Sequence, residues 1–380
     1  MNILYLTSAI EQKDYEEFQK SWMKPLNCSN QLFHSRLISS LSNNNVINVI
    51  SFRPFNKMCS MHKLEYEEKE NGNIKWFYLK EKKNTLFNYF SVYKQFDSIL
   101  FKLTNIDIVL FDSMNVIIGS FAQKLKSVGY KIIPVCTDLP ENIQGVNQTY
   151  IDFVYKHSLN ADGYIALSEG LNEKFNHDGK PYAIVNGILT NQSVSSKELE
   201  YENYFLFSGA LMKKYGLYTC IDAFKKLNNP KIKLLLCGHH GDVEYLKDYI
   251  KDSSNIIFLG YIENDLVRKY ETNSIANICP RPLNENIDLY SIPSKCIEYL
   301  SSGSILISTK NPLLMPLFKE EVLWSDEDEN SLKDQMIKAI SLSKEERKEL
   351  TNKAKEKMNK LYSPDEIANK LGQLFSKIIG

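Results

Sequence analysis

The densest group of side chains able to bind an anion lies in the stretch 277–303. A short apolar run ends at Arg281, and Ser291, Ser294 and Lys295 stand further on, where the sequence predicts that a helix opens. The first N–H groups of a helix have no intrahelical partner and lie at the positive end of its dipole, so they bind phosphate groups well. Arg281 and Lys295 add positive charge. We predict a phosphate site here, with an ordinary helix start as the open alternative.

Three carboxylates accompany this stretch. Glu298 lies one turn into the predicted helix, where it could accept hydrogen bonds from a pair of ribose hydroxyls. Glu285 and Asp288 lie in the polar loop before the helix. The alternative for Glu298 is a solvated acid in the first helical turn.

A second group of residues follows three strands predicted in the second half of the chain. Gly209 and Gly238 each come directly after or near the end of a strand, where a missing Cβ lets the backbone approach a ligand. Lys213 and Lys214 could neutralise a diphosphate, and Tyr261 could stack on a nucleobase. The pattern is neither a Walker loop nor G-x-G-x-x-G, and a plain strand–turn–helix unit also explains it.

The first half of the chain places acids at the ends of two predicted strands. Asp138 follows the strand at 131–136, and Asp112 follows the strand at 107–111. Such a carboxylate could order an acceptor hydroxyl or serve as a general base, whereas a cap for the next helix is the alternative. His34, on a predicted helix, is interpreted as a residue at the boundary of the core.

Strands and helices must alternate along the chain to position these residues. Short β-branched runs and amphipathic segments follow one another from residue 2 to 190 and again from 204 to 308, as in parallel sheets covered on both faces. The polar stretch 190–203 separates them. We predict an α/β protein of two doubly wound Rossmann-like domains facing a cleft, over 1–190 and 203–362, and a C-terminal helix over 364–380 begun by Ser363.

Composition narrows the class of protein. The chain has 380 residues, 46 basic and 46 acidic side chains, and 43% apolar residues, which fits two globular domains and argues against a nucleic-acid partner. Seven scattered cysteines indicate core residues in a reducing compartment. With no signal peptide and no long apolar window, we expect a cytoplasmic protein. The run Lys80–Lys83 could touch lipid headgroups, although ordinary surface is the simpler interpretation.

Metal binding is not expected. Asp326-Glu-Asp328 has the form of a D-x-D metal-binding motif, but it lies in an acidic run at a turn, and a solvated loop is the favoured interpretation. His239 and His240 have no partner at metal-ligand spacing. We predict neither a metal nor another cofactor.

At these residues the chain resembles the retaining GT-B glycosyltransferases of family 4, especially the branch that builds bacterial capsular polysaccharides and exopolysaccharides. The most specific phrase is Tyr290-Ser-Ile-Pro-Ser-Lys-Cys-Ile-Glu298-Tyr-Leu-Ser-Ser-Gly303. The weaker phrases are Ser208-Gly209, Tyr215-Gly216-Leu217, Cys237-Gly238, Phe258-Leu-Gly260-Tyr261, Pro280-Arg281-Pro282, Asp138-Leu-Pro140 and Val185-Asn-Gly187.

The resemblance implies a hexosyltransferase that moves a hexose or deoxyhexose from a nucleotide diphosphate sugar to a glycan or lipid-linked acceptor, with retention and without a metal. It implies that the second domain binds the donor, with Glu298 on the ribose and Gly209 against the diphosphate. It also implies that the first domain binds the acceptor and that the helix 364–380 crosses back onto it. An enzyme with a lipid-linked acceptor would work at the inner face of the membrane.

The sequence departs from the family pattern near the donor. The family has a second acid eight positions before Glu298, where this chain has Tyr290, and Ala210 and Tyr215 replace an Arg and a Lys. Glu285 or Asp288 could replace the missing acid. Two other functions stay open: a catalytically silent partner subunit of the same fold, and a nucleotide-sugar epimerase.

Overall fold

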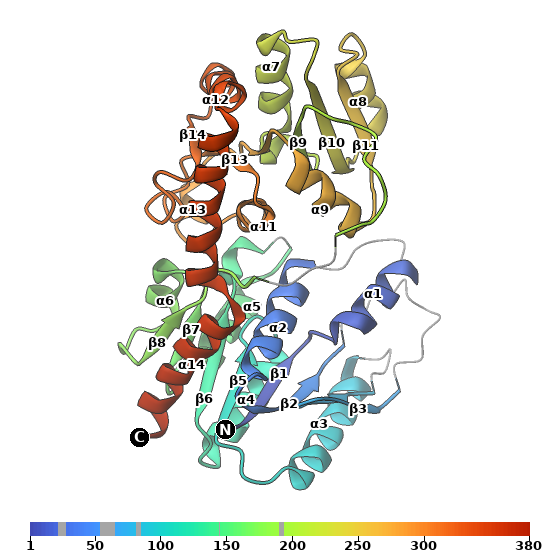
Figure 1. Cartoon of the computed structure of the whole chain (residues 1–380). Helices are drawn as coiled ribbons and strands as arrows, with labels where there is room; N and C mark the ends of the chain where they lie inside the picture. Colours follow the sequence, from blue (N-terminus) through green and yellow to red (C-terminus); the bar gives the residue numbers. More distant parts are fainter. Residues whose placement is uncertain (22–27, 54–64, 81–84, 144, 190–193) are drawn as a thin grey trace. The chain divides into compact units, whose positions relative to one another are not determined.

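The computed structural model describes residues 1–21, 28–53, 65–80, 85–143, 145–189 and 194–380, and it divides the chain into two compact units (Figure 1). The first unit comprises Met1–Thr190 and Tyr362–Gly380, and the second comprises Asn191–Leu361. Each unit is built on its own β-sheet.

The sheet of the first unit has eight strands in the order β3-β4-β2-β1-β5-β6-β7-β8. All neighbouring strands are parallel except β3 and β4, which form an antiparallel pair. Strand order reverses beside β1, so the carboxyl ends of β1, β5 and β6 share one edge of the sheet, as in doubly wound folds. The strands are β1 (Asn2–Thr7), β2 (Val46–Ser51), β3 (Glu67–Asn71), β4 (Ile74–Tyr78), β5 (Ile108–Asp112), β6 (Ile132–Cys136), β7 (Tyr164–Ala166) and β8 (Tyr182–Ile184).

Helices cover this sheet, and the C-terminal helix α14 (Pro364–Ile379) lies beside α2 (Cys28–Leu41) (Figure 1). Ser363 begins α14, because its side chain accepts a hydrogen bond from Glu366 N, as predicted. Ile367, Leu371 and Phe375 of α14 are buried in the same core as β1 and β2. The other helices are α1 (Gln12–Ser21), α3 (Thr85–Lys102), α4 (Val116–Ser127), the 3₁₀ turn η1 (Pro140–Asn142), α5 (Gln148–Ser158) and α6 (Glu169–Phe175).

The sheet of the second unit is fully parallel, with six strands in the order β11-β10-β9-β12-β13-β14. Its strands are β9 (Tyr204–Ala210), β10 (Lys233–His239), β11 (Ile256–Gly260), β12 (Ala276–Cys279), β13 (Ile305–Thr309) and β14 (Leu323–Ser325). Its helices are the 3₁₀ turn η2 (Lys213–Tyr215), α7 (Leu217–Leu227), α8 (Val243–Ile250), α9 (Asn264–Asn273), α10 (Glu285–Asp288), α11 (Ser294–Ser302), α12 (Glu329–Ser341) and α13 (Lys344–Tyr362). This is again the doubly wound pattern that the alternation of apolar runs predicted.

One expectation about local structure is wrong. The polar loop predicted between Arg281 and the next helix contains a short helix of its own, α10. The following helix, α11, begins at Ser294. Ser291 lies outside it, because Ser291 N donates to Ile287 O at 3.0 Å and so continues the turn of α10.

Candidate functional site

Two glycines form the centre of the carboxyl edge of the second sheet. Gly209 in β9 and Gly238 in β10 are paired in register and have φ angles of 126° and 141°, which residues with a Cβ rarely adopt. A Cβ added to Gly238 would lie 1.8 Å from Gly209 O. The chain therefore requires glycine here, and the backbone is left open at this edge.

Lys295 lies beside Gly209 and between two carboxylates. A Cβ added to Gly209 would meet Lys295 Cε at 3.4 Å. Lys295 Nζ lies 2.6 Å from Glu298 Oε2, one turn along α11, and 3.2 Å from Glu271 Oε1 on α9. Burial alone would lower the pKa of Lys295, but the carboxylates of Glu298 and Glu271 raise it well above its usual range. Lys295 is therefore a fixed positive charge at the glycine edge.

Glu271 is a member of this group that the sequence analysis missed. Its side chain is buried, with 4% exposure, and its Oε1 accepts a hydrogen bond from Ser208 Oγ at 2.9 Å. Tyr299 Oη completes the arrangement by accepting from Ser208 N at 2.8 Å. A signal was present in the sequence, because Glu271 lies one helical turn after Val267 and so on the apolar face of α9. Buried acids are almost always paired, which makes such a position informative.

The start of α11 differs in detail from the predicted phosphate cradle. Its N-cap residue is Pro293, and no side chain caps the helix. The first amides, including those of Ser294 and Lys295, have no hydrogen-bond acceptor within the helix. Ser291 does not contribute a free N–H, as its amide is bonded to Ile287 O. Tyr290, before it, is half-buried and donates its own amide to Ile287 O at 2.9 Å.

The two acids of the 282–290 segment have different environments. Glu285 is exposed on α10. Asp288 is buried, and its two carboxylate oxygens accept hydrogen bonds from Asn284 N and from Asn311 Nδ2. These bonds hold the segment together and account for the burial of Asp288 without a ligand.

The other residues that we predict to bind the sugar donor lie in separate loops at the carboxyl edge of the second sheet. Arg281 is half-buried two residues after β12, and its carbonyl accepts from Thr309 Oγ1 at 2.6 Å. Lys213 and Lys214 are exposed on η2. Tyr261 follows β11 and is 75% exposed. The structure thus brings together Gly209, Gly238, Lys295 and Glu298. The side chains of Arg281, Lys213, Lys214 and Tyr261 lie around this group.

In the first unit, acidic and hydroxyl side chains lie at the carboxyl edge of the sheet. Asp112 is buried at the end of β5, with Oδ2 3.2 Å from Asn30 Nδ2 and 3.6 Å from His34 Nε2. His34 is fully buried, so its interpretation as a boundary residue is wrong; its Nδ1 lies 2.7 Å from Tyr5 Oη. Burial lowers the pKa of His34, although Asp112 acts in the opposite direction. The histidine therefore stays neutral at neutral pH.

Asp138 lies two residues beyond β6 in the same unit. Its side chain reaches solvent, yet the surrounding protein and the nearby Asp112 carboxylate raise its pKa to about 6. Tyr150, whose pKa is raised to about 12 by burial and by the same two acids, donates to Met114 O at 2.7 Å. A carboxyl group that titrates near neutral pH can exchange a proton with a bound hydroxyl.

Other candidate features have structural explanations. Asp328 caps α12 by accepting from Asn330 N and Ser331 N, and Asp326 Oδ1 pairs with Lys310 at 2.6 Å. Within the described ranges, no three His, Cys, Asp or Glu side chains are grouped as a metal site. His240 is buried and bonded to Tyr218 Oη at 3.2 Å.

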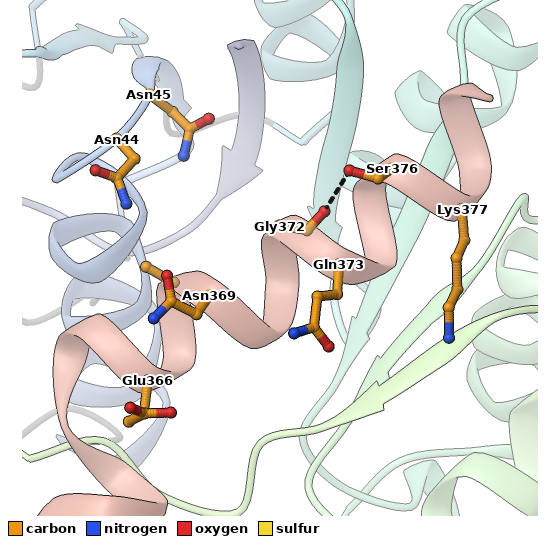
Figure 2. Close-up of a pocket in the computed structure, with 9 residues that line it drawn as sticks. Asn44, Asn45, Glu366, Asn369, Gly372, Gln373, Ser376 and Lys377 are labelled. Carbon is orange, nitrogen blue, oxygen red and sulfur yellow. Dashed lines mark hydrogen bonds between the residues drawn. The ribbon is translucent and has the colours of Figure 1, made fainter.

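A groove of about 800 Å³ runs along α14 in the first unit (Figure 2). Amide side chains line it, namely Asn44, Asn45, Asn369 and Gln373, and it is open to solvent. None of the predicted site residues borders it. Separately, of the helices that the structure describes, none combines the length and apolar character needed to cross a bilayer.

The second unit is similar in sequence to a known protein family. Residues 190–357 match the family model described as "Glycosyl transferases group 1", which spans nearly the whole second unit. A search of curated proteins found no match.

Solved structures match both units together. A sucrose-phosphate synthase from Thermosynechococcus elongatus has 14% identity and a TM-score of 0.71, covering 100% of this chain and 99% of that one. Anabaena Alr3699/HepE in complex with UDP has 13% identity and a TM-score of 0.68, covering 99% and 100%. A trehalose-6-phosphate structure from E. coli bound with UDP-2-fluoro glucose has 14% identity and a TM-score of 0.62, covering 99% of each. The chain therefore has the GT-B fold of two α/β units, with the C-terminal helix packed on α2 of the first, as predicted.

Proposed function

We propose that this chain is a retaining, metal-independent glycosyltransferase that transfers a hexose or deoxyhexose from a nucleotide diphosphate sugar to a glycan or lipid-linked acceptor. We place it in the cytoplasm, in bacterial surface polysaccharide synthesis, with peripheral contact to the membrane where the acceptor is lipid-linked. The observation that carries the proposal is the group Gly209–Lys295–Glu298 at the carboxyl edge of the second sheet, inside the region that matches the glycosyl transferase model.

In this proposal the second unit binds the donor. The open backbone at Gly209 and Gly238 and the uncapped start of α11 receive the diphosphate, and Lys295 and Arg281 neutralise the charge that develops as it departs. Glu298 accepts hydrogen bonds from the ribose hydroxyls, and the exposed ring of Tyr261 stacks on the base. Lys213 and Lys214 supply further positive charge near the edge.

The first unit binds the acceptor in this proposal. Asp138, with its pKa near 6, accepts a hydrogen bond from the attacking hydroxyl and orients it. Glu285 is the exposed acid left to contact the donor sugar from the second unit. The buried Asp288 supports that segment through its bonds to Asn284 and Asn311.

Calorimetry on the purified chain tests the proposal. Anabaena Alr3699/HepE is described in complex with UDP, so UDP is titrated first, followed by GDP and TDP. We expect one of the three to bind. The Glu298→Gln variant should lose most of that affinity, because a neutral amide replaces the carboxylate that accepts hydrogen bonds from the ribose. Absence of heat with all three nucleotides would overturn the proposal.

Incubation with the sugar nucleotide that binds distinguishes the other two functions. A transferase releases nucleoside diphosphate when a suitable acceptor is present. An epimerase converts the donor alone into an isomeric sugar nucleotide, and a silent partner subunit binds the donor and changes nothing.

A further inference from the structure

The buried carboxylate of Glu271 contacts Ser208 and Lys295 through the same oxygen. Its Oε1 lies 2.9 Å from Ser208 Oγ and 3.2 Å from Lys295 Nζ. Ser208 precedes Gly209 in β9, so this acid joins the helix α9 to the glycine edge and to the ammonium group beside it. Its side chain is only 4% exposed, so a solvent-borne ligand has little access to it.

Glu298 is the second partner of Lys295 and differs from Glu271 in accessibility. Its side chain is 31% exposed, against 4% for Glu271, and it lies on the same helix as the lysine. A carboxylate that accepts hydrogen bonds from ribose hydroxyls shares its acceptor sites between them and the lysine. Glu271 is too deeply buried to share its acceptor sites with a ligand.

We propose that Glu271 is a positioning residue that holds the ammonium group of Lys295 beside Gly209 while Glu298 is engaged by the ribose of the donor. The inference rests on the proposed function and adds a role to it: Lys295 stays directed at the diphosphate because one of its two anchors is out of reach of the ligand. Glu271 itself touches neither donor nor acceptor.

Charge alone predicts the opposite effect of removing Glu271. A carboxylate near a diphosphate repels it, so its neutralisation should tighten binding if Glu271 contributes only its charge. If it positions Lys295, the loss of the anchor should weaken binding, since the long lysine side chain regains its rotamer freedom. The sign of the change therefore separates the two roles.

The experiment measures the affinity of the full chain for the nucleoside diphosphate found by calorimetry, with UDP first. We expect Glu271→Gln to weaken binding about tenfold and Lys295→Met to weaken it at least as much. The double variant should match Lys295→Met alone, because an anchor without its lysine has nothing to position. Glu263→Gln is the matched control, as Glu263 pairs with Lys197 at 2.7 Å on the surface of the same unit, and it should leave the affinity unchanged.

Glu271→Asp keeps the charge but shortens the side chain by one methylene, so it should also weaken binding, and it serves if the Gln variant does not fold. Tighter or unchanged binding in Glu271→Gln, or effects of Glu271→Gln and Lys295→Met that simply multiply in the double variant, would overturn the inference and leave the proposed function standing. If the wild type binds none of the three nucleotides, the proposed function fails, and the inference with it.

Discussion

The two sheets end in chemically different residues at the same kind of edge. In the second unit, β9, β10 and β11 end at or near Gly209, Gly238 and Gly260, all with φ in the left-handed region. In the first unit, β5 and β6 end with Asp112 and, two residues beyond β6, Asp138. The same doubly wound fold thus presents open backbone and a cation in the second unit, and acidic side chains in the first. The first arrangement suits an anionic ligand, and the second suits donors of hydrogen bonds such as sugar hydroxyls.

The buried acids of the two edges are also compensated differently. Glu271 has an ammonium group at 3.2 Å, so its charge is paired with an opposite one. Asp112 lies among Asn30, the neutral His34 and the amide of Met114, which donates at 3.0 Å. Because no cation offsets Asp112 in these contacts, its field reaches Asp138 and helps to raise the pKa of that group.

The glycine edge is the feature whose loss should cost most. We expect Gly238→Ala to lower the free energy of unfolding of the second unit by about 4 kcal/mol, since the new Cβ would overlap Gly209 O and φ is 141°. Gly241→Ala is the control, because nothing lies within 4 Å of its added Cβ, and its effect should stay within about 0.5 kcal/mol. Urea unfolding followed by circular dichroism measures both. Equal stability of the two variants would show that the close approach of β9 and β10 is not required.

Removing the positive charge of Lys295 at the glycine edge should have the next largest effect on stability. We expect Lys295→Met to destabilise the protein by about 2–3 kcal/mol, because Glu271 is left buried without its opposite charge. Adding Glu271→Gln should recover much of this loss, as the buried charge is then gone. Thermal unfolding of the two variants compares them. A double variant less stable than Lys295→Met would contradict the view that charge compensation distinguishes this edge.

Much of this comparison was accessible from the sequence. Helices α7 and α8 each have a clear apolar stripe, which is the local pattern that predicts a helix. The pair β3–β4 was missed, since β3 reads Glu-Glu-Lys-Glu-Asn and forms an exposed edge strand without apolar alternation. Helix α13 was missed for a similar reason, as its sequence is largely charged.

The candidate site was predictable only in part. Gly209, Lys295 and Glu298 were identified from strand ends and a helix start, which depend on local sequence. Glu271 was not, because its partner Lys295 is 24 residues away and only the packing of α9 against α11 brings them together. Long-range pairing of buried charges has no local pattern, whereas the burial of an acid on an apolar helix face does.

A pH effect should distinguish the acidic edge of the first unit. The pKa of Asp138 is raised from 3.8 to about 6, so the folded protein binds the proton more tightly than the unfolded chain. Its contribution to stability is therefore full below pH 4 and is lost as pH rises through about 6. Relative to wild type, Asp138→Asn should be more stable at pH 7.5 by about 1.5 kcal/mol, a value reduced for solvent screening, and this gain should vanish near pH 4. Unfolding titrations across this range measure the difference. A gain independent of pH would contradict the raised pKa.

The helix starts extend the comparison with the smallest expected effect. In the first unit, α4 follows β5 and is capped by Asn115, whose Oδ1 accepts from Ile117 N and Ile118 N at 3.1 and 3.2 Å. In the second unit, α11 follows β12 and α10 and has Pro293 at its N-cap, with no side-chain cap. We expect Asn115→Ala to cost about 1 kcal/mol in urea unfolding, because two amides lose their acceptor. Ser127→Ala, in the last turn of α4, should cost less. If both substitutions had the same effect, the cap would not stabilise α4, and the contrast between a helix start capped by a side chain and one without such a cap would lose its energetic basis.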